Sequence, residues 1–476
     1  MNDDLYSGYL RYKEIDFAFV FDGEELQLTP PKGLESKIFH EWVMTPIGDG
    51  VYSYRGDKPQ MEESHLVGEC TASGKEIVFL SQVGARIGFR NTVFVVPIYA
   101  YIVCKRERKG IDCISFRGPE IDYIHPVNQA VQYRFDQDAY VKDGVFSITT
   151  LDFDATTTQE QEFAVDGKRT NVRFSITRGM NMSIGNPPIT LYSTMLFEFE
   201  ETDDYEYIIK LWGIAKEFIR FLCYRRNVFF STVELSAPDG KGMHIPFATL
   251  HVLHEAGDTE LETLHKKRYI QQSYINGYEG KILEDIAENT LYTRHIPETY
   301  ASGKHINAAR FVMIIAAFEW EFRRVYPDGI PRDEKKKQIE EKATEEIENL
   351  IKNSTGELKK KYKFLKRLIK SDPLQIEISQ IGKDYDEIVG IFGEALYHMN
   401  GEQLIYSEMG QRLGDQRNHY AHGDLDKEFI GASLLDLMYM ELILYAMQLK
   451  RYGVSNSNIQ KAINQLFERH VAIGAN

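Results

Sequence analysis

Residues 414–426 read GDQRNHYAHGDLD and gather side chains that could do chemistry on a phosphodiester: Arg417, Asn418, His419 and His422. A histidine can remove the proton from a ribose 2′-hydroxyl or protonate a leaving 5′-oxygen. An arginine can hold a phosphate bidentately and stabilise the charge that develops on it. An asparagine can orient an imidazole or bind a phosphate oxygen. The stretch therefore contains the side chains that RNA cleavage without a metal ion requires.

A helix is expected to carry these residues and to end beside them. From about Glu402 onward, apolar side chains recur at a spacing of three to four residues, which is typical of a helix with one buried face. Gly423 stands where a left-handed helix cap is expected, and Asp424 or Asp426 can cap the next helix. The apolar residues of this stripe are Tyr406, Met409, Leu413 and Tyr420.

The polar side chains should converge at the end of that helix. Asn418 and His422 are four residues apart and share a face, which lies roughly opposite Tyr420. The long side chain of Arg417 can reach round from the border of the apolar stripe. The negative end of the helix dipole favours a cationic histidine there, and histidine titrates near neutral pH.

The order Arg417-Asn418-His419-Tyr420-Ala421-His422 resembles the ribonuclease motif of the HEPN superfamily. In that motif a polar Asn, Asp or His follows the arginine, and the catalytic histidine comes after four to six intervening residues. The resemblance implies that Arg417, Asn418 and His422 are the catalytic residues, whereas His419 fills a variable position and has a supporting role.

The overall layout resembles the ApeA-like anti-phage proteins, which join a large β-rich N-terminal domain to a C-terminal HEPN domain. This resemblance implies an endoribonuclease and toxin that acts in abortive infection, cutting an RNA such as a tRNA to leave a 2′,3′-cyclic phosphate. It also implies a homodimer formed through the C-terminal domain, with two motifs in one cleft. A phage-derived trigger would act on the N-terminal domain.

Glu319 is a second candidate for the site, in a supporting role. It lies on the apolar face of the helix expected over 306–326, four residues after Ile315 and three before Phe322. A carboxylate on such a face needs a partner. Arg417 would suit, and pairing with the neighbouring Arg323 is the open alternative.

A basic run at residues 359–370, KKKYKFLKRLIK, could contact the RNA backbone. The alternative is the solvated face of a helix whose Leu365, Leu368 and Ile369 point inward. The RNA-binding candidates are Lys359, Lys360, Lys361, Lys363, Lys366 and Arg367.

The chain is expected to be an α+β protein with two domains. Residues 1–285 contain β-branched and aromatic runs separated by turn residues, interrupted by one amphipathic helix over 204–226. Residues 286–476 show helical periodicity, including a stretch over 427–451 that is apolar almost all round and should be buried. The segment 300–304, YASGK, is the expected hinge.

The amino-acid composition limits which kinds of site and which cellular location the chain can have. The 476 residues carry a net charge of −15, so any nucleic-acid site must be local. The longest apolar run, 93–104, is too short to cross a bilayer. The four cysteines lack the spacing of metal ligands and are expected to be reduced thiols in a cytoplasmic protein.

No metal and no cofactor are expected. His251 and His254 are separated by two residues and would face opposite sides of a strand. A phosphate-binding Gly-Lys-Ser/Thr loop and a GxSxG elbow are both absent from the sequence. The rival hypothesis is a non-catalytic HEPN-fold module that binds a ligand or RNA, or that only dimerises.

Overall fold

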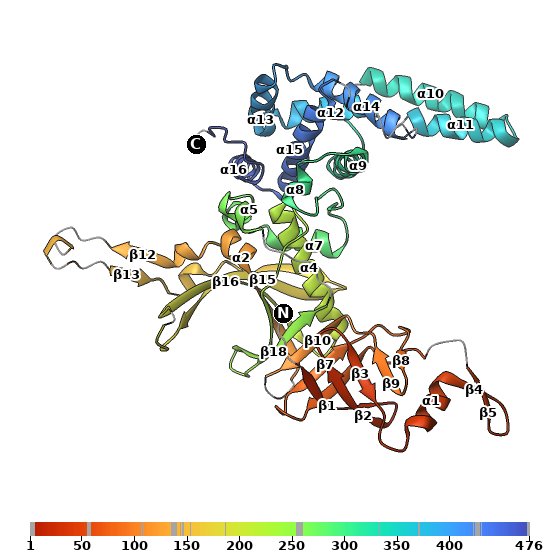
Figure 1. The fold of residues 1–476 in the computed structure, drawn as a ribbon. Helices are drawn as coiled ribbons and strands as arrows, with labels where there is room; N and C mark the ends of the chain where they lie inside the picture. The colour runs from red at the N-terminus through yellow and green to blue at the C-terminus, as the bar shows by residue number, and fades with distance from the viewer. Residues whose placement is uncertain are drawn as a thin grey trace. The chain divides into compact units, whose positions relative to one another are not determined.

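The computed structural model describes residues 5–54, 59–105, 107, 109–134, 140–142, 144, 147–152, 154–185, 187–253, 260–332, 334–369, 372–421, 423, 429 and 431–473. The chain divides into two compact units. The β unit comprises Met1–Lys216 and Asn227–Thr259, and the helical unit comprises Glu217–Arg226 and Glu260–Asn476. The prediction of an α+β protein, with a β-rich first half and a helical second half, is confirmed (Figure 1).

The β unit is built on one antiparallel sheet, which has 14 strands in the described part of the chain. Strands that are neighbours in sequence are often not neighbours in the sheet, so the order depends on long-range pairing. In spatial order the strands are β14 (Gln161–Val165), β15 (Lys168–Met180), β16 (Ile189–Thr202), β11 (Ile111–Arg117), β17 (Thr232–Pro238), β18 (His244–Val252), β10 (Ala100–Cys104), β7 (Glu76–Leu80), β6 (His65–Cys70), β1 (Tyr6–Tyr12), β2 (Ile15–Phe21), β3 (Leu26–Thr29), β9 (Val93–Val96) and β8 (Gly88–Arg90).

Burial along the strands follows their place in this sheet. Strand β1 alternates between exposed and buried side chains, as a strand with one solvated face does. Strands β10 and β11 are buried at nearly every position, so both of their faces are covered. The four cysteines, Cys70, Cys104, Cys113 and Cys223, are buried and are not joined in disulfides, as expected for reduced thiols.

Two short helices and two ribbons complete the β unit together with the first part of a longer helix. The helix α1 contributes Trp42, whose ring packs against Phe17 and Phe94 with centroid distances of 5.6 and 4.7 Å. The Tyr207 hydroxyl lies 2.7 Å from the Thr170 hydroxyl of β15. These elements are α1 (Glu35–Val43), α2 (Pro119–Ile124), α4 (Tyr205–Cys223), and the pairs β4 (Met44–Gly48) with β5 (Val51–Tyr54) and β12 (Val131–Arg134) with β13 (Ser147–Thr150).

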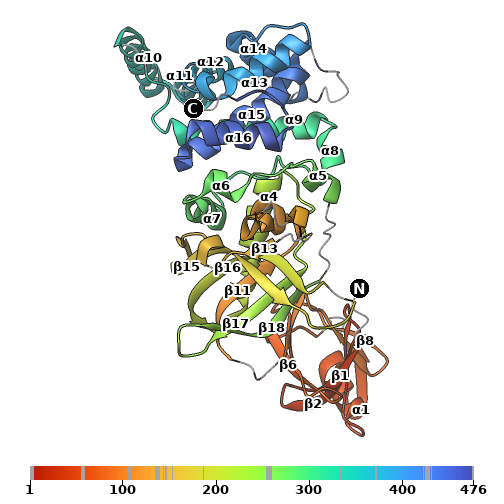
Figure 2. The same ribbon diagram turned by 90° about the vertical axis from the view of Figure 1, so that its left-hand side faces the viewer.

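The helical unit surrounds one long buried helix, α15, which is buried at every position from Tyr439 to Leu449, as its apolar character predicted (Figure 2). The helices are α5 (Leu261–His265), α6 (Gln272–Ile275), α7 (Glu279–Ala287), α8 (Tyr300–Gly303), α9 (Ala308–Val325), α10 (Glu334–Lys352), α11 (Gly356–Ile369), α12 (Leu374–Asp384), α13 (Asp386–Met399), α14 (Tyr406–Ala421), α15 (Ser433–Tyr452) and α16 (Asn456–Leu466). None of the helices in the described ranges has the length and apolar character needed to cross a membrane.

Buried ion pairs join α7, α9 and α15. The carboxylate of Asp285 on α7 lies 3.0 Å from the Arg324 guanidinium of α9 and 2.7 Å from the Arg451 guanidinium of α15. The side chain of Arg451 also pairs with the fully buried Glu321 of α9 at 2.5 Å. The boundary expected after residue 285 therefore falls inside α7, and the helices from Glu260 onward belong to the helical unit.

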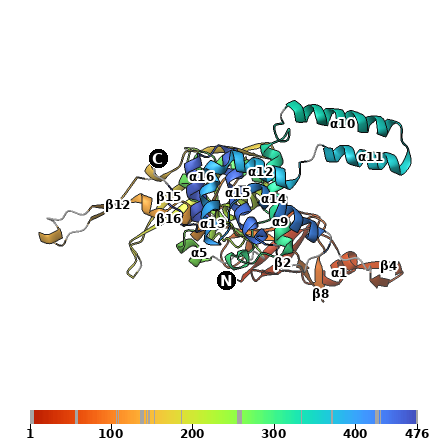
Figure 3. The same cartoon turned by 90° about the horizontal axis from the view of Figure 1, so that it is seen from above.

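Helices α10 and α11 pack against each other as a hairpin that extends from the remaining helices of the unit (Figure 3). This hairpin contains the basic run. Leu365 is 44% exposed, so the expectation that it points inward is wrong. Phe364 and Leu358 on the same helix are also exposed.

Candidate functional site

The C-terminal part of α14 carries residues 417–421 of the motif. Met409, Leu413 and Tyr420 are buried as the periodicity predicted, and Gln416 is fully buried in the same stripe. The helix begins at Tyr406 and not near Glu402. Gly423 has φ +92°, and its N–H donates to the Tyr420 carbonyl at 3.2 Å, so the predicted left-handed cap is present.

Arg417 reaches from α14 to Glu319 on α9. Its Nη1 and Nη2 atoms donate to the two carboxylate oxygens at 2.5 and 3.3 Å, which is a bidentate pair. The Glu319 side chain is only 16% exposed, whereas that of Arg417 is 46% exposed. Glu319 therefore fixes one edge of the guanidinium while the side chain stays accessible to a ligand.

Arg323 is a second and weaker partner of Glu319. Its Nη2 atom lies 3.7 Å from the carboxylate, and its side chain is 72% exposed. Both partners considered from the sequence thus contact Glu319, with Arg417 in the closer geometry. On the same helix, Phe311, Ile315, Phe318 and Phe322 are buried, whereas Val312 is 45% exposed.

A buried ion pair holds α14 against α15 one turn before Arg417. The Arg412 Nε and Nη2 atoms donate to the Asp436 carboxylate at 2.7 and 2.8 Å. Asp436 is fully buried and also accepts the Tyr397 hydroxyl at 2.5 Å. The ring of Tyr420 packs edge-on against Phe311 of α9 at 5.2 Å. These contacts set the position from which Arg417 extends.

Glu377 on α12 is a member of the site that the sequence did not indicate. Burial raises the pKa of this carboxyl to about 7, and the nearby Glu319 carboxylate raises it as well. The guanidinium groups of Arg323 and Arg417 oppose the shift. The site thus includes a carboxyl group whose pKa burial raises toward neutral pH.

Helices α12 and α14 come unusually close, which brings Glu377 to the site. A Cβ atom placed on Gly410 of α14 would lie 2.6 Å from the Gln375 Cα atom of α12. A Cβ atom on Gly382 of α12 would lie 2.4 Å from the Tyr406 ring. Only glycine permits this approach at either position.

Glu377→Gln is expected to stabilise the protein at pH 8 but not at pH 4. A carboxyl whose pKa is higher in the folded than in the unfolded state favours folding below its unfolded pKa. This contribution to stability is lost as the pH rises through the folded-state pKa of about 7. The gain above pH 7 should be roughly 1–3 kcal/mol.

Urea unfolding of both forms between pH 4 and 8 measures this effect, with Glu402→Gln as the control because Glu402 is exposed. A stability difference that does not change with pH would contradict the assignment of a raised pKa to Glu377.

The other residues predicted around the motif are only partly described by the structure. Asn418 is exposed and His419 is partly buried in the last turn of α14. His422, Asp424 and Asp426 lie outside the described residues. The helix expected over 427–451 begins at Ser433, with Ala432 at its N-cap and no side-chain cap.

The basic run lies on α11 with its lysines at the surface. Lys360 pairs with Glu357 at 2.7 Å within the helix, and Lys366 pairs with Glu348 of α10. The Arg367 side chain lies outside the described part of the structure. Lys361 and Lys363 are exposed, and Lys359 is partly buried.

His251 does not contribute to a metal site in the described structure. Its ring stacks on Tyr101 at a centroid distance of 4.7 Å, and His254 is among the residues that the structure leaves undescribed. Among the described residues, no group of three or more His, Cys, Asp or Glu side chains is arranged to hold a metal ion.

Comparison with known proteins gives no relative. No protein-family model, no curated protein and no solved structure matches this chain.

Proposed function

We propose that the helical unit is a metal-independent endoribonuclease of the HEPN type that acts in defence against phage. The observation that carries the proposal is the Arg417 guanidinium, held at the end of α14 by Glu319 in a bidentate contact. It stands one residue before Asn418 and five before His422 in the ribonuclease-like motif.

In the proposed reaction, His422 acts as the acid or base and Arg417 stabilises the phosphate. A base removes the proton of the ribose 2′-hydroxyl, and the oxygen attacks the adjacent phosphorus. The bond to the 5′-oxygen breaks, and that oxygen receives a proton, which leaves a 2′,3′-cyclic phosphate. Arg417 would bind a non-bridging oxygen as charge accumulates there. Asn418 would add one hydrogen bond, and His419 would contribute least.

A homodimer would bring two motifs together, and the exposed lysines of α11 would add contacts to the RNA backbone. In this proposal the β unit receives the signal that starts cleavage during infection. The protein works in the cytoplasm, where its RNA substrate is found.

The test is RNA incubation in EDTA with the intact protein and with His422→Ala. The intact protein is expected to cut RNA to products ending in a 2′,3′-cyclic phosphate or its hydrolysed monophosphate. A strand with 2′-deoxyribose at the cut position should resist, because it lacks the attacking oxygen. Cleavage of that strand, or a strict need for magnesium, would rule out the mechanism.

A non-catalytic binding module is the second candidate, and one contact favours it. The Glu319 carboxylate already balances the charge of Arg417, as it would in a purely structural ion pair. Under this alternative, intact protein and His422→Ala would bind RNA or a ligand equally well and neither would cut.

A further inference from the structure

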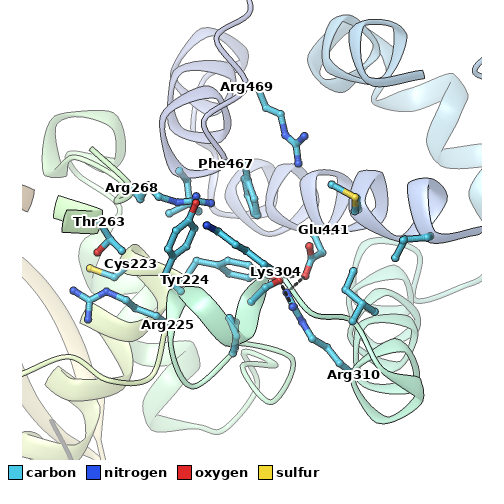
Figure 4. A pocket seen from close by; sticks show the side chains of 17 residues that line it. Cys223, Tyr224, Arg225, Thr263, Arg268, Lys304, Arg310, Glu441, Phe467 and Arg469 are labelled. Atoms are coloured by element: carbon cyan, nitrogen blue, oxygen red, sulfur yellow. Dashed lines mark hydrogen bonds and ion pairs between the residues drawn. The ribbon is translucent and has the colours of Figure 1, made fainter. Parts of the chain in front are cut away.

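A pocket of about 270 Å³ lies within the helical unit, and none of the described motif residues lines it. Its walls come from the end of α4, from α5 and α8, from the start of α9, from α15, and from the chain after α16 (Figure 4). It is therefore a second candidate site, separate from Arg417.

The pocket is strongly cationic in a protein whose net charge is −15. Its basic residues include Arg268, Lys304, Arg310 and Arg469, and Glu441 is the acidic residue among the described lining residues. A cluster of basic side chains around one cavity attracts a compact anion even when the whole molecule is acidic.

Most of these basic side chains already have a neighbour that balances their positive charge. Arg310 donates from Nη2 to Glu441 at 2.7 Å, a pair that Figure 4 shows as a dashed line. Arg268 pairs with Glu468 at 2.9 Å. Lys304 places its ammonium 4.4 Å from the centre of the Tyr300 ring.

The Nε–H group of Arg469 differs, because it is buried and has no hydrogen-bond acceptor in the described part of the chain. Burial lowers the pKa of this guanidinium, and the Arg268 charge lowers it too, while Glu441 raises it. A buried guanidinium N–H without an acceptor is costly. An anion in the pocket would supply the acceptor and reduce the repulsion between Arg469 and Arg268.

Part of the pocket lining is apolar. Leu434 and Met438 of α15 lie there, as do Leu466 and the ring of Phe467. In Figure 4 the Phe467 ring and the Arg469 side chain extend from the same segment toward Glu441. A ligand that fills the pocket would need an anionic end and an apolar or flat end.

We propose that this pocket binds a small molecule in which phosphate is joined to an apolar or aromatic group, as it is in a nucleotide. Arg469 and Lys304 would hold the phosphate, because guanidinium and ammonium groups are the usual phosphate ligands. Phe467 would contact the flat group. The proposal does not rest on ribonuclease activity, since binding is measured without RNA.

Isothermal titration of the full chain with ATP, pyrophosphate and adenosine tests the proposal. ATP is expected to bind saturably, pyrophosphate more weakly, and adenosine at least tenfold more weakly than ATP. Arg469→Ala should weaken ATP binding by roughly tenfold or more, as expected for the loss of a charge-assisted contact. Lys304→Ala should weaken it as well, and because Lys304 is exposed this variant should fold normally.

Lys450→Ala is the matched control. Lys450 is an exposed lysine of α15 outside the pocket lining, so its removal changes net charge equally without touching the site. ATP binding that is unchanged in both Arg469→Ala and Lys304→Ala would overturn the proposal, as would no binding of ATP or pyrophosphate. Pyrophosphate binding as tightly as ATP would overturn the assignment to a ligand with a flat group.

Discussion

Arg417→Ala is expected to lower the rate of RNA cleavage by about 10²–10³-fold, because a guanidinium that stabilises transition-state charge contributes on that scale. It should also weaken RNA binding, since an arginine that contacts phosphate does so in the ground state as well. Arg417→Lys should not restore the rate, because an ammonium cannot keep the bidentate contact with Glu319 while it binds phosphate. Single-turnover cleavage at saturating RNA separates the two effects.

Arg323→Ala is the matched control for this experiment. Arg323 contacts the same carboxylate of Glu319, but at 3.7 Å and from an exposed position. Its removal deletes one positive charge near the site and leaves the Arg417 contact in place. Exposed pairs of this kind contribute little to stability. Equal losses of cleavage in Arg323→Ala and Arg417→Ala would mean that the region needs only positive charge, and the proposed role of Arg417 would be wrong.

Several strands and helices of this protein could be predicted from sequence because each depends on a local pattern. The run rich in aromatic residues over 15–21 and the near-continuous apolar character of 439–449 correspond to β2 and to the centre of α15. The order of the sheet could not be predicted in this way. It pairs β11 with β16 and β17, and β10 with β18, across long stretches of chain, and no local pattern encodes those partners.

Helix ends were predicted less well than helix cores. The helix expected from Glu402 begins at Tyr406, because Gly401 takes φ +72° and residues 402–405 are not helical. The helix expected from residue 427 begins at Ser433, shortly after Gly431, which takes φ +51°. In both places a glycine with positive φ precedes the helix, so the helix begins later than expected. The apolar periodicity of the helix itself does not indicate this starting point.

The site shows the same division between local and non-local information. Glu319 could be selected from sequence, because a carboxylate on an apolar helix face needs a cation nearby. Glu377 could not, because an acidic residue in the first turn of a helix is ordinary. Its importance arises from the close approach of α12 and α14 at Gly382 and Gly410, which only the folded chain reveals.

Asp436→Ala is expected to destabilise the helical unit by roughly 3–5 kcal/mol, the usual effect of removing one member of a buried ion pair. Arg412 would lose two hydrogen bonds, and the Tyr397 hydroxyl would lose its acceptor in a fully buried site. Because Arg412 lies on the helix that carries Arg417, a looser α14 should also reduce cleavage at temperatures well below unfolding.

Glu408→Ala provides the comparison, since Glu408 contacts the same Arg412 guanidinium at 3.5 Å but is 58% exposed. Its effect should remain within about 1 kcal/mol, as for other surface pairs. The double change Arg412→Met with Asp436→Leu should recover much of the loss, because an apolar pair of similar volume can replace a buried ion pair. Thermal and urea unfolding of the three variants measure these differences. If Asp436→Ala costs no more than Glu408→Ala, the Arg412–Asp436 contact does not hold α14, and the position of Arg417 must depend on Glu319 and the Tyr420 packing alone.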